Sequence, residues 1–305
     1  MLERHRAAVR ARLLRSDHVR PGPDSTTWRV NREVIVVAGW GRAILLLLAH
    51  PAIAAGVHDH SAFRLSLLSR FRRLRSTVGA MQALTFGDTE QLVEAAAAIN
   101  LIHDRVHGPV RDGARGEYSA HDPELQRWVH ATLVESILLI YERLIGPLSP
   151  RERDQYCAEA ALMEPLLGMP AGWLPRDASQ LDTYMRAMFS SDAIIVTDPA
   201  RTLARAVLSP PQRFIVWPVF RALQLFTIGS LSPDIRESYG FEWRARDARA
   251  LARWTAFLRA ALRILPPAAR EWPMARHAAG KIVALDYSNP VIRGVRFTRV
   301  GDPNR

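Results

Sequence analysis

The residues best suited to chemistry in this sequence are histidines placed on apolar helix faces. Between Thr89 and His107, an apolar stripe recurs at intervals of four, three, four and three residues. The stripe consists of Leu92, Ala96, Ile99, His103 and Val106. This spacing puts all of them on one face of a helix, so His103 is expected to point into the interior. A neutral imidazole there can bind a metal or a haem iron, and the alternative is a core histidine bonded to a backbone carbonyl.

Two further histidines are candidate ligands. His107 lies four residues after His103, and such a pair can chelate zinc, although no acidic residue between them completes a His-Glu-x-x-His motif. His130 shares a stripe with Val134 and Ile137 on the next predicted helix, so it also faces an apolar environment. It is either a buried structural histidine or part of a site shared with His103.

Three other side chains could act on a substrate or on oxygen. Arg73 and Thr77 lie four residues apart in an arginine-rich segment, which stacks them on one helix face. A guanidinium beside a hydroxyl suits a polar pocket for carboxylates, phosphates or bound oxygen, and the alternative is a solvated helix face. Glu33 is the only acid in its apolar stretch, and it is either a buried general base or a first-turn carboxylate favoured by the helix dipole.

The elements that must position these residues are predicted to be helices. Helical periodicity runs from Asn31 to about Lys281, and strand alternation is nearly absent. Asp88, Asp122 and Ser149 stand where residues that cap helix N-termini are expected. Further helices are expected near residues 178–190, 198–207, 212–228 and 244–264. The sequence therefore predicts an all-α fold, a single large domain of about ten helices with a short extended C-terminal tail.

The chain divides into three predicted parts. Residues 1–27 form a basic N-terminal arm that ends at Pro21-Gly22-Pro23, residues 28–285 form the helical domain, and residues 286–305 form the extended tail. The arm is amphipathic over residues 1–20, so it could dock peripherally on an anionic lipid surface. Residues 1–20 lack the apolar core of a signal peptide, so we expect a cytoplasmic protein.

The bulk composition narrows the class of protein. The formal net charge is +11, and nearly all of the positive charge is arginine because Lys281 is the only lysine. This bias reflects either arginine codons in a GC-rich genome or an anionic partner. One cysteine, Cys157, permits no internal disulfide and excludes iron–sulfur clusters within one chain. Residues 34–57 are the one transmembrane candidate, but Arg42 and His50 interrupt them, so we interpret them as a buried core helix.

Several other chemistries find no support in the sequence. It contains no Gly-x-Ser-x-Gly nucleophile elbow and no Walker loop. Gly39-Trp40-Gly41 lacks the preceding strand and the third glycine of a dinucleotide fingerprint. Nothing matches a nucleic-acid-binding motif, so we expect no nucleic-acid partner.

A set of short motifs in a fixed order resembles a known family. They are Val30-Asn31-Arg32-Glu33, Gly41-Arg42-Ala43, Leu48-Ala49-His50-Pro51, Arg73-Leu74-x-x-Thr77, Phe86-Gly87, His103-x-x-Val106-x-Gly108, Tyr118-x-Ala120 and Trp128-Val129-His130. The set resembles the catalytic domain shared by fungal MpaB oxygenase and the bacterial latex-clearing proteins, which are rubber oxygenases. The resemblance covers roughly residues 28–230.

The resemblance implies a globin-like helical fold around haem b. The rubber oxygenases use dioxygen to split carbon–carbon double bonds, and their proximal iron ligand is a histidine in a His-x-x-x-Arg stretch. That histidine falls on His103, but the fourth position here is His107 rather than arginine. The distal Arg-x-x-x-Thr pair of the family matches Arg73 and Thr77, and His130 matches a supporting histidine.

Two departures from the rubber oxygenases shape the expected function. Some of them carry a lysine just before the distal threonine, where this chain has Ser76, so a lysine-capped haem is not expected. The rubber oxygenases are secreted, whereas this sequence shows no export signal. We therefore expect a haem-b-dependent oxygenase that acts with dioxygen on an intracellular apolar, terpenoid- or lipid-like substrate. The alternative is a haem-free ligand-binding or membrane-surface protein on the same fold.

Overall fold

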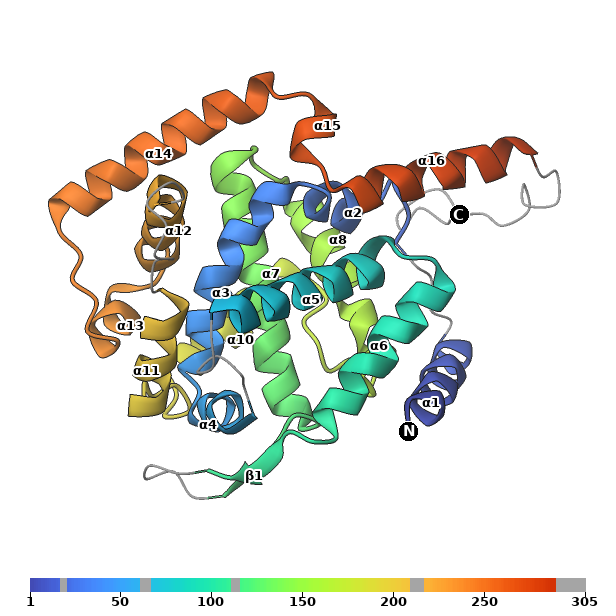
Figure 1. The fold of residues 1–305 in the computed structure, drawn as a ribbon, viewed down its shortest axis with the longest axis horizontal. Helices are drawn as coiled ribbons and strands as arrows, with labels where there is room; N and C mark the ends of the chain where they lie inside the picture. The colour runs from blue at the N-terminus through green and yellow to red at the C-terminus, as the bar shows by residue number, and fades with distance from the viewer. Residues whose placement is uncertain (17–20, 61–66, 111–115, 209–216, 289–305) are drawn as a thin grey trace.

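The computed structural model describes residues 1–16, 21–60, 67–110, 116–208 and 217–288, and it is all-α apart from one small hairpin (Figure 1). The first half of the chain forms α1 (Leu2–Arg15), α2 (Thr26–Asn31), the 3-10 helix η1 (Val34–Val37), α3 (Ala38–Leu48), α4 (Pro51–His60), α5 (Leu67–Phe86) and α6 (Thr89–His103). The hairpin pairs β1 (His107–Pro109) with β2 (Glu117–Ser119) in antiparallel register, His107 opposite Ser119.

The second half is also helical. Its elements are α7 (Pro123–Leu144), α8 (Pro150–Ala160), the 3-10 helix η3 (Ala161–Met163), α9 (Glu164–Leu167), α10 (Ala178–Phe189), α11 (Asp198–Val207), α12 (Trp217–Gly229), α13 (Pro233–Ser238), α14 (Ala245–Ile264), α15 (Pro267–Arg270) and α16 (Pro273–Ser288). The all-α prediction is confirmed. The predicted helices mostly persist, and several of them break into shorter pieces.

The predicted helix starts are confirmed by their caps. The carboxylate of Asp88 accepts a hydrogen bond from the backbone N–H of Gln91, and the side-chain oxygen of Gln91 accepts one from the backbone N–H of Asp88. Asp122 caps α7 ahead of Pro123, and Ser149 caps α8 through a capping box with Glu152. These side chains satisfy amides that the helix leaves without partners in its first turn.

Two helix ends differ from the prediction. The apolar periodicity extends to His107, but α6 ends at His103 because the chain turns through Asp104 and enters β1, whose backbone pairs with β2. At the C-terminus, α16 continues to Ser288, past the expected end near Lys281. The rest of the predicted extended tail, residues 289–305, lies outside the described residues.

The single core helix predicted over residues 34–57 is divided in the structure into η1, α3 and α4, because the chain bends sharply where Pro51 begins α4. The central piece, α3, is the inner helix of the fold. It packs against α7 and α12 (Figure 1). Gly39 and Gly41 allow this close approach, since a Cβ at Gly39 would lie 2.5 Å from the Ser136 carbonyl oxygen and one at Gly41 would collide with the Thr227 side chain. The two glycines therefore serve helix packing rather than nucleotide binding.

Within the described residues, no single helix is both long and apolar enough to cross a membrane. One pair of helices, Val34–Leu48 with Pro51–His60, meets those criteria when taken together, and the chain bends by 107° between them.

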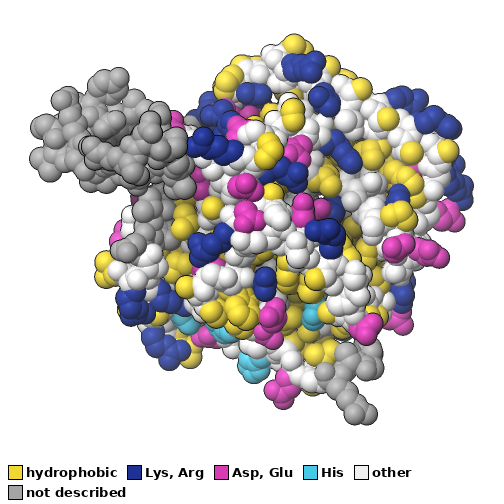
Figure 2. Space-filling view, turned by 180° about the vertical axis from the view of Figure 1, so that it is seen from behind, with side chains coloured by type: hydrophobic (Ala, Val, Ile, Leu, Met, Phe, Trp, Pro, Cys, Tyr) yellow, Lys and Arg dark blue, Asp and Glu magenta, His cyan; other side chains and the backbone are white. Residues whose placement is uncertain are grey.

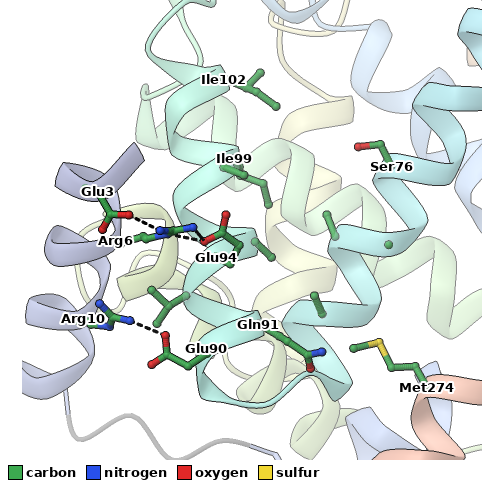
Figure 3. Close-up of a pocket in the computed structure, with 16 residues that line it drawn as sticks. Glu3, Arg6, Arg10, Ser76, Glu90, Gln91, Glu94, Ile99, Ile102 and Met274 are labelled. Atoms are coloured by element: carbon green, nitrogen blue, oxygen red, sulfur yellow. Dashed lines mark hydrogen bonds and ion pairs between the residues drawn. The ribbon is translucent and has the colours of Figure 1, made fainter. Parts of the chain in front are cut away.

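The basic N-terminal arm forms α1, which packs against α6 and α9. Figure 3 shows Arg6 and Arg10 of α1 directed at Glu94 and Glu90 of α6, with which they form ion pairs. On its inner side, Val9 is fully buried in an apolar cluster with residues of α5, α6 and α9. Residues 17–20, between α1 and the main body, lie outside the described residues.

A buried arginine fixes α3 to its neighbours. Arg42 is 5% exposed, and its guanidinium binds the Glu135 carboxylate and the Ser136 hydroxyl of α7. It also donates to the Ser230 carbonyl oxygen, just after α12, at 2.8 Å. All of these contacts link separate segments, so one side chain ties three helices together.

Replacing Arg42 by alanine should therefore lower the free energy of unfolding sharply. Without the guanidinium, the Glu135 carboxylate loses its counter-charge in a poorly solvated position. We expect the free energy of unfolding, measured with urea, to fall by about 3 kcal/mol. The matched control is Arg10→Ala, which removes an exposed pair with Glu90 and should cost less than about 1 kcal/mol. Equal losses in the two variants would contradict the role assigned to Arg42.

Candidate active site

A mainly apolar cavity of about 510 Å³, here called the histidine cavity, lies between α4, α5, α6, α7, η3 and α9. Its volume is in the range of pockets that bind drug-sized ligands and cofactors. Its apolar wall includes Ile53 and Val57 of α4, Met81 and Leu84 of α5, Leu92 and Ile99 of α6, Val129, Leu133 and Ile137 of α7, and Leu162, Leu166 and Leu167 of η3 and α9. Apolar helix faces from both halves of the chain therefore enclose it.

Two of the predicted site residues, His103 and His130, line this cavity together. His103 is the last residue of α6, and Leu92, Ile99 and Val106 of its predicted stripe line the same cavity. His130 lies in α7, with Val134 and Ile137 of its own stripe on the cavity wall. The sequence pattern thus identified which way both imidazoles face.

Burial keeps both imidazoles neutral. Desolvation and, to a smaller extent, the nearby His121 lower the pKa of His103 to about 4, while the negative charge of Asp104 opposes the shift. Desolvation also lowers the pKa of His130 to about 4, although the hydrogen bond to the Ala160 carbonyl oxygen acts to raise it. A neutral imidazole keeps a nitrogen lone pair, which is the form that binds a metal.

The hydrogen bonds of His130 define its tautomer. Its Nε2 lies 3.0 Å from the carbonyl oxygen of Ala160, which can only accept, so Nε2 carries the proton. Its Nδ1 then holds a lone pair, and this atom is buried without a hydrogen-bond partner in the described structure. A histidine that donates one N–H to a backbone carbonyl and leaves the other nitrogen open has the arrangement typical of metal-ligating histidines.

The environment of His103 is different. Its Nδ1 is also buried without a hydrogen-bond partner among the described residues. Its ring packs edge to face against His121, with 5.6 Å between ring centroids. Asp104, the next residue, accepts from His121 at 2.9 Å and from the buried His5 of α1 at 2.8 Å. Asp104 therefore joins α1, the end of α6 and the segment before α7, and it fixes the end of the helix that carries His103.

The other predicted site residues lie elsewhere. His107 is exposed on β1, so it does not share a helix face with His103. Thr77 lies on α5 and is exposed, and it is not among the described residues that line the cavity. Arg73 also lies on α5, but its side chain is outside what the structure describes. The roles assigned to these three residues stay predictions.

Glu33 is buried away from the histidine cavity. It is 2% exposed, and burial raises its pKa, while Arg270 opposes that shift from 3.6 Å. Its Oε2 has no hydrogen-bond partner in the described part of the chain. Its backbone forms an isolated bridge with Glu271. These contacts join the start of the core to the α15–α16 segment, and the role of Glu33 as a base stays a prediction.

The sequence analysis assigned no role in the site to several polar residues that lie at the cavity. The Tyr118 hydroxyl donates to Asp59 and lies 3.1 Å from Nε2 of His60. Tyr156 donates to Asn31 at 2.9 Å. Thr27 also lines the cavity, and its hydroxyl is buried without a hydrogen-bond partner among the described residues. Asp104 and His121 were missed as well, although a carboxylate directly after the candidate ligand was a readable signal.

A second hollow is less suited to chemistry. It is a surface groove of about 700 Å³ between α1, α5 and α6 (Figure 3). Its rim holds arginines and glutamates that already pair with each other, and its floor is formed largely by alanines such as Ala80, Ala83, Ala95 and Ala98. No histidine is among its described lining residues.

Comparison with known proteins identifies the family. The sequence model described as "ER-bound oxygenase mpaB/B'/Rubber oxygenase, catalytic domain" matches residues 28–260, which is most of the chain. This chain belongs to the mpaB and rubber oxygenase family. The matched region runs from within α2 to within α14 and contains both histidines of the cavity. The resemblance inferred from the short motifs is thereby confirmed.

Two mycobacterial relatives show similarity over most of their length. Uncharacterized proteins of Mycobacterium bovis and Mycobacterium tuberculosis are each 28% identical to this chain over 228 residues. The aligned region covers 73% of this chain and 87% of each relative. No solved structure matches this chain significantly.

The buried His130 should make folding stability depend on pH in the cofactor-free protein. Its pKa is about 4 when folded, and a histidine of the unfolded chain titrates near 6.5. Between these values the unfolded state binds more protons, so the free energy of unfolding should fall as the pH drops through this window. Replacing His130 by glutamine should make that slope shallower, by up to about 1 kcal/mol per pH unit.

Urea unfolding at several pH values between 4 and 7 measures this slope. His277→Gln is the control, because His277 is exposed on α16 and its replacement should leave the slope unchanged. If His130→Gln reproduces the wild-type slope, His130 is not the buried neutral group described above.

Proposed function

We propose that this protein is a haem-b-dependent oxygenase that uses dioxygen to oxidise an apolar, terpenoid- or lipid-like molecule. The observation that carries the proposal is the pair of neutral histidines on the wall of an apolar cavity of about 510 Å³. Family membership supports the oxygenase activity. The haem and the substrate class are the parts that this proposal adds.

The residues present fit a haem group. His103 and His130 each have a buried Nδ1 without a hydrogen-bond partner in the described structure, and both rings are neutral near pH 7. The apolar wall suits the faces of a porphyrin. The unpartnered Thr27 hydroxyl on the same wall is a donor that could bind a propionate carboxylate.

In this proposal His103 is the iron ligand and His130 a supporting residue on the opposite helix. Haem, when bound, would supply the iron that activates dioxygen. The side chains of α4, α6 and α7 would exclude water and hold an apolar substrate by contact alone. The Asp104 contacts with His5 and His121 would hold the end of α6, and with it His103, in one position. Arg73 and Thr77 of α5 stay the predicted oxygen-side pair from the sequence, but the described structure has Thr77 exposed and outside the lining of the cavity, so this proposal assigns them no contact.

The test is an absorption spectrum of the protein reconstituted with haemin, before and after reduction with dithionite. We expect one haem per chain and a Soret band that shifts on reduction. His103→Ala should lose haem or change the spectrum strongly, whereas the matched control His107→Ala removes an exposed histidine and should leave the spectrum unchanged.

Each contrary result has a defined meaning. An unchanged spectrum and full haem content in His103→Ala would refute the assignment of His103 as the iron ligand. If only His130→Ala loses haem, His130 is the iron ligand instead. A wild-type protein that binds no haemin would refute the haem-dependent oxygenase and favour a haem-free protein that binds apolar ligands. For a haem-loaded protein, incorporation of labelled oxygen from dioxygen into an isoprenoid or unsaturated lipid tests the substrate class.

A further inference from the structure

The outer face of α14 is basic and apolar at the same time. This helix of 20 residues is the long outer helix at the edge of the molecule, where it packs on α12 and α7 (Figure 1). Its inward stripe, which includes Asp247, Leu251, Trp254, Leu258 and Leu262, recurs at intervals of four, three, four and four residues. The inward side is therefore an ordinary amphipathic packing face.

The outward stripe has a different composition. Intervals of three, four, four, three and four residues place six outward side chains on one side of the helix. They are Arg246, Arg249, Arg253, Phe257, Ala260 and Ile264. Phe257 is 62% exposed and Ile264 is 84% exposed, and Leu265 follows directly at 40%. The stripe is thus cationic in its first half and apolar in its second half.

No acidic side chain in the described ranges pairs with the arginines of this face. Asp247 is the one acid of α14, and it is 8% exposed because it faces inward and binds Arg221 of α12 at 2.7 Å. None of Arg246, Arg249 and Arg253 forms an ion pair with any residue in the described part of the chain. In Figure 2, Lys and Arg side chains gather along the edge of the molecule where α14 lies, at the upper right.

We propose that the outward face of α14 docks on an anionic lipid bilayer. Arginines near the surface would attract acidic headgroups, while Phe257, Ile264 and Leu265 would enter the boundary between headgroups and acyl chains. A surface helix with this arrangement lies in the plane of the interface. This docking face lies apart from the histidine cavity and from the N-terminal arm, so docking would require neither haem nor the reaction.

Two other occupants fit the face less well. A second copy packed in parallel would bring like charges together, and one packed antiparallel would set the arginines of each chain against the apolar side chains of the other, so in neither arrangement would the guanidinium groups gain a counter-charge. A nucleic acid would pair with the arginines but would leave the exposed phenylalanine and isoleucine unburied in water. A lipid surface satisfies both halves of the stripe.

The experiment is flotation of the full-length protein with vesicles of phosphatidylcholine alone or with phosphatidylglycerol added. We expect binding to the anionic vesicles, weaker binding at high salt, and little binding to phosphatidylcholine. Arg249→Glu with Arg253→Glu should weaken the partition coefficient by more than about tenfold. Phe257→Ser with Ile264→Ser should also weaken it. All four positions are exposed, so the variants should fold, which circular dichroism checks.

The matched control is Arg4→Glu with Arg15→Glu, the same charge change on exposed positions of the N-terminal arm. Binding that survives in this control and is lost in both α14 variants supports the proposal. Unchanged binding of either α14 variant, loss only in the arm variant, or absence of binding by the wild type would overturn it. Association into dimers, or binding to DNA, without vesicle binding would also overturn it.

Discussion

The buried guanidinium of Arg42 is the interaction on which the arrangement of the core depends. It lies on α3 and binds α7 through Glu135 and Ser136 and the end of α12 through the Ser230 carbonyl. A buried arginine is tolerated only when its charge is paired and its donors are satisfied, so these contacts fix how the three helices sit together. Gly39 and Gly41 allow the close approach that brings the partners within reach. Because α7 carries His130 and much of the cavity wall, this packing also sets the shape of the site.

The site itself depends on desolvation. An imidazole is charged when its pKa exceeds the pH, and burial among apolar side chains lowers the pKa of His103 and His130 to about 4. Both rings therefore remain neutral at physiological pH and retain a lone pair. The same apolar wall that lowers these pKa values would also exclude water from an apolar substrate, so the proposed iron ligand and the proposed substrate class rest on one physical cause.

The sequence predicts the parts of this structure that depend on local periodicity and capping. The stripe through Leu92, Ile99 and His103 identified an inward-facing histidine, and Asp122 with Pro123 marked the start of α7. It did not predict that α6 ends at His103, because that end depends on the pairing of β1 with β2, a contact between segments. It could not place Thr77 or Glu33 relative to the cavity for the same reason. Local spacing tells which face a residue occupies, and tertiary packing decides which faces meet. The cytoplasmic location also remains a prediction from sequence.

The most direct test of the account is a crystal structure of the haemin-reconstituted protein. The account predicts a porphyrin inside the histidine cavity between α6 and α7, with iron bound to a ring nitrogen of His103 and the apolar side chains of both helices against its faces. A porphyrin bound elsewhere, such as in the groove between α1 and α5, would contradict the assignment of the site. Iron bound within the cavity by a residue other than His103 would contradict the assignment of the ligand.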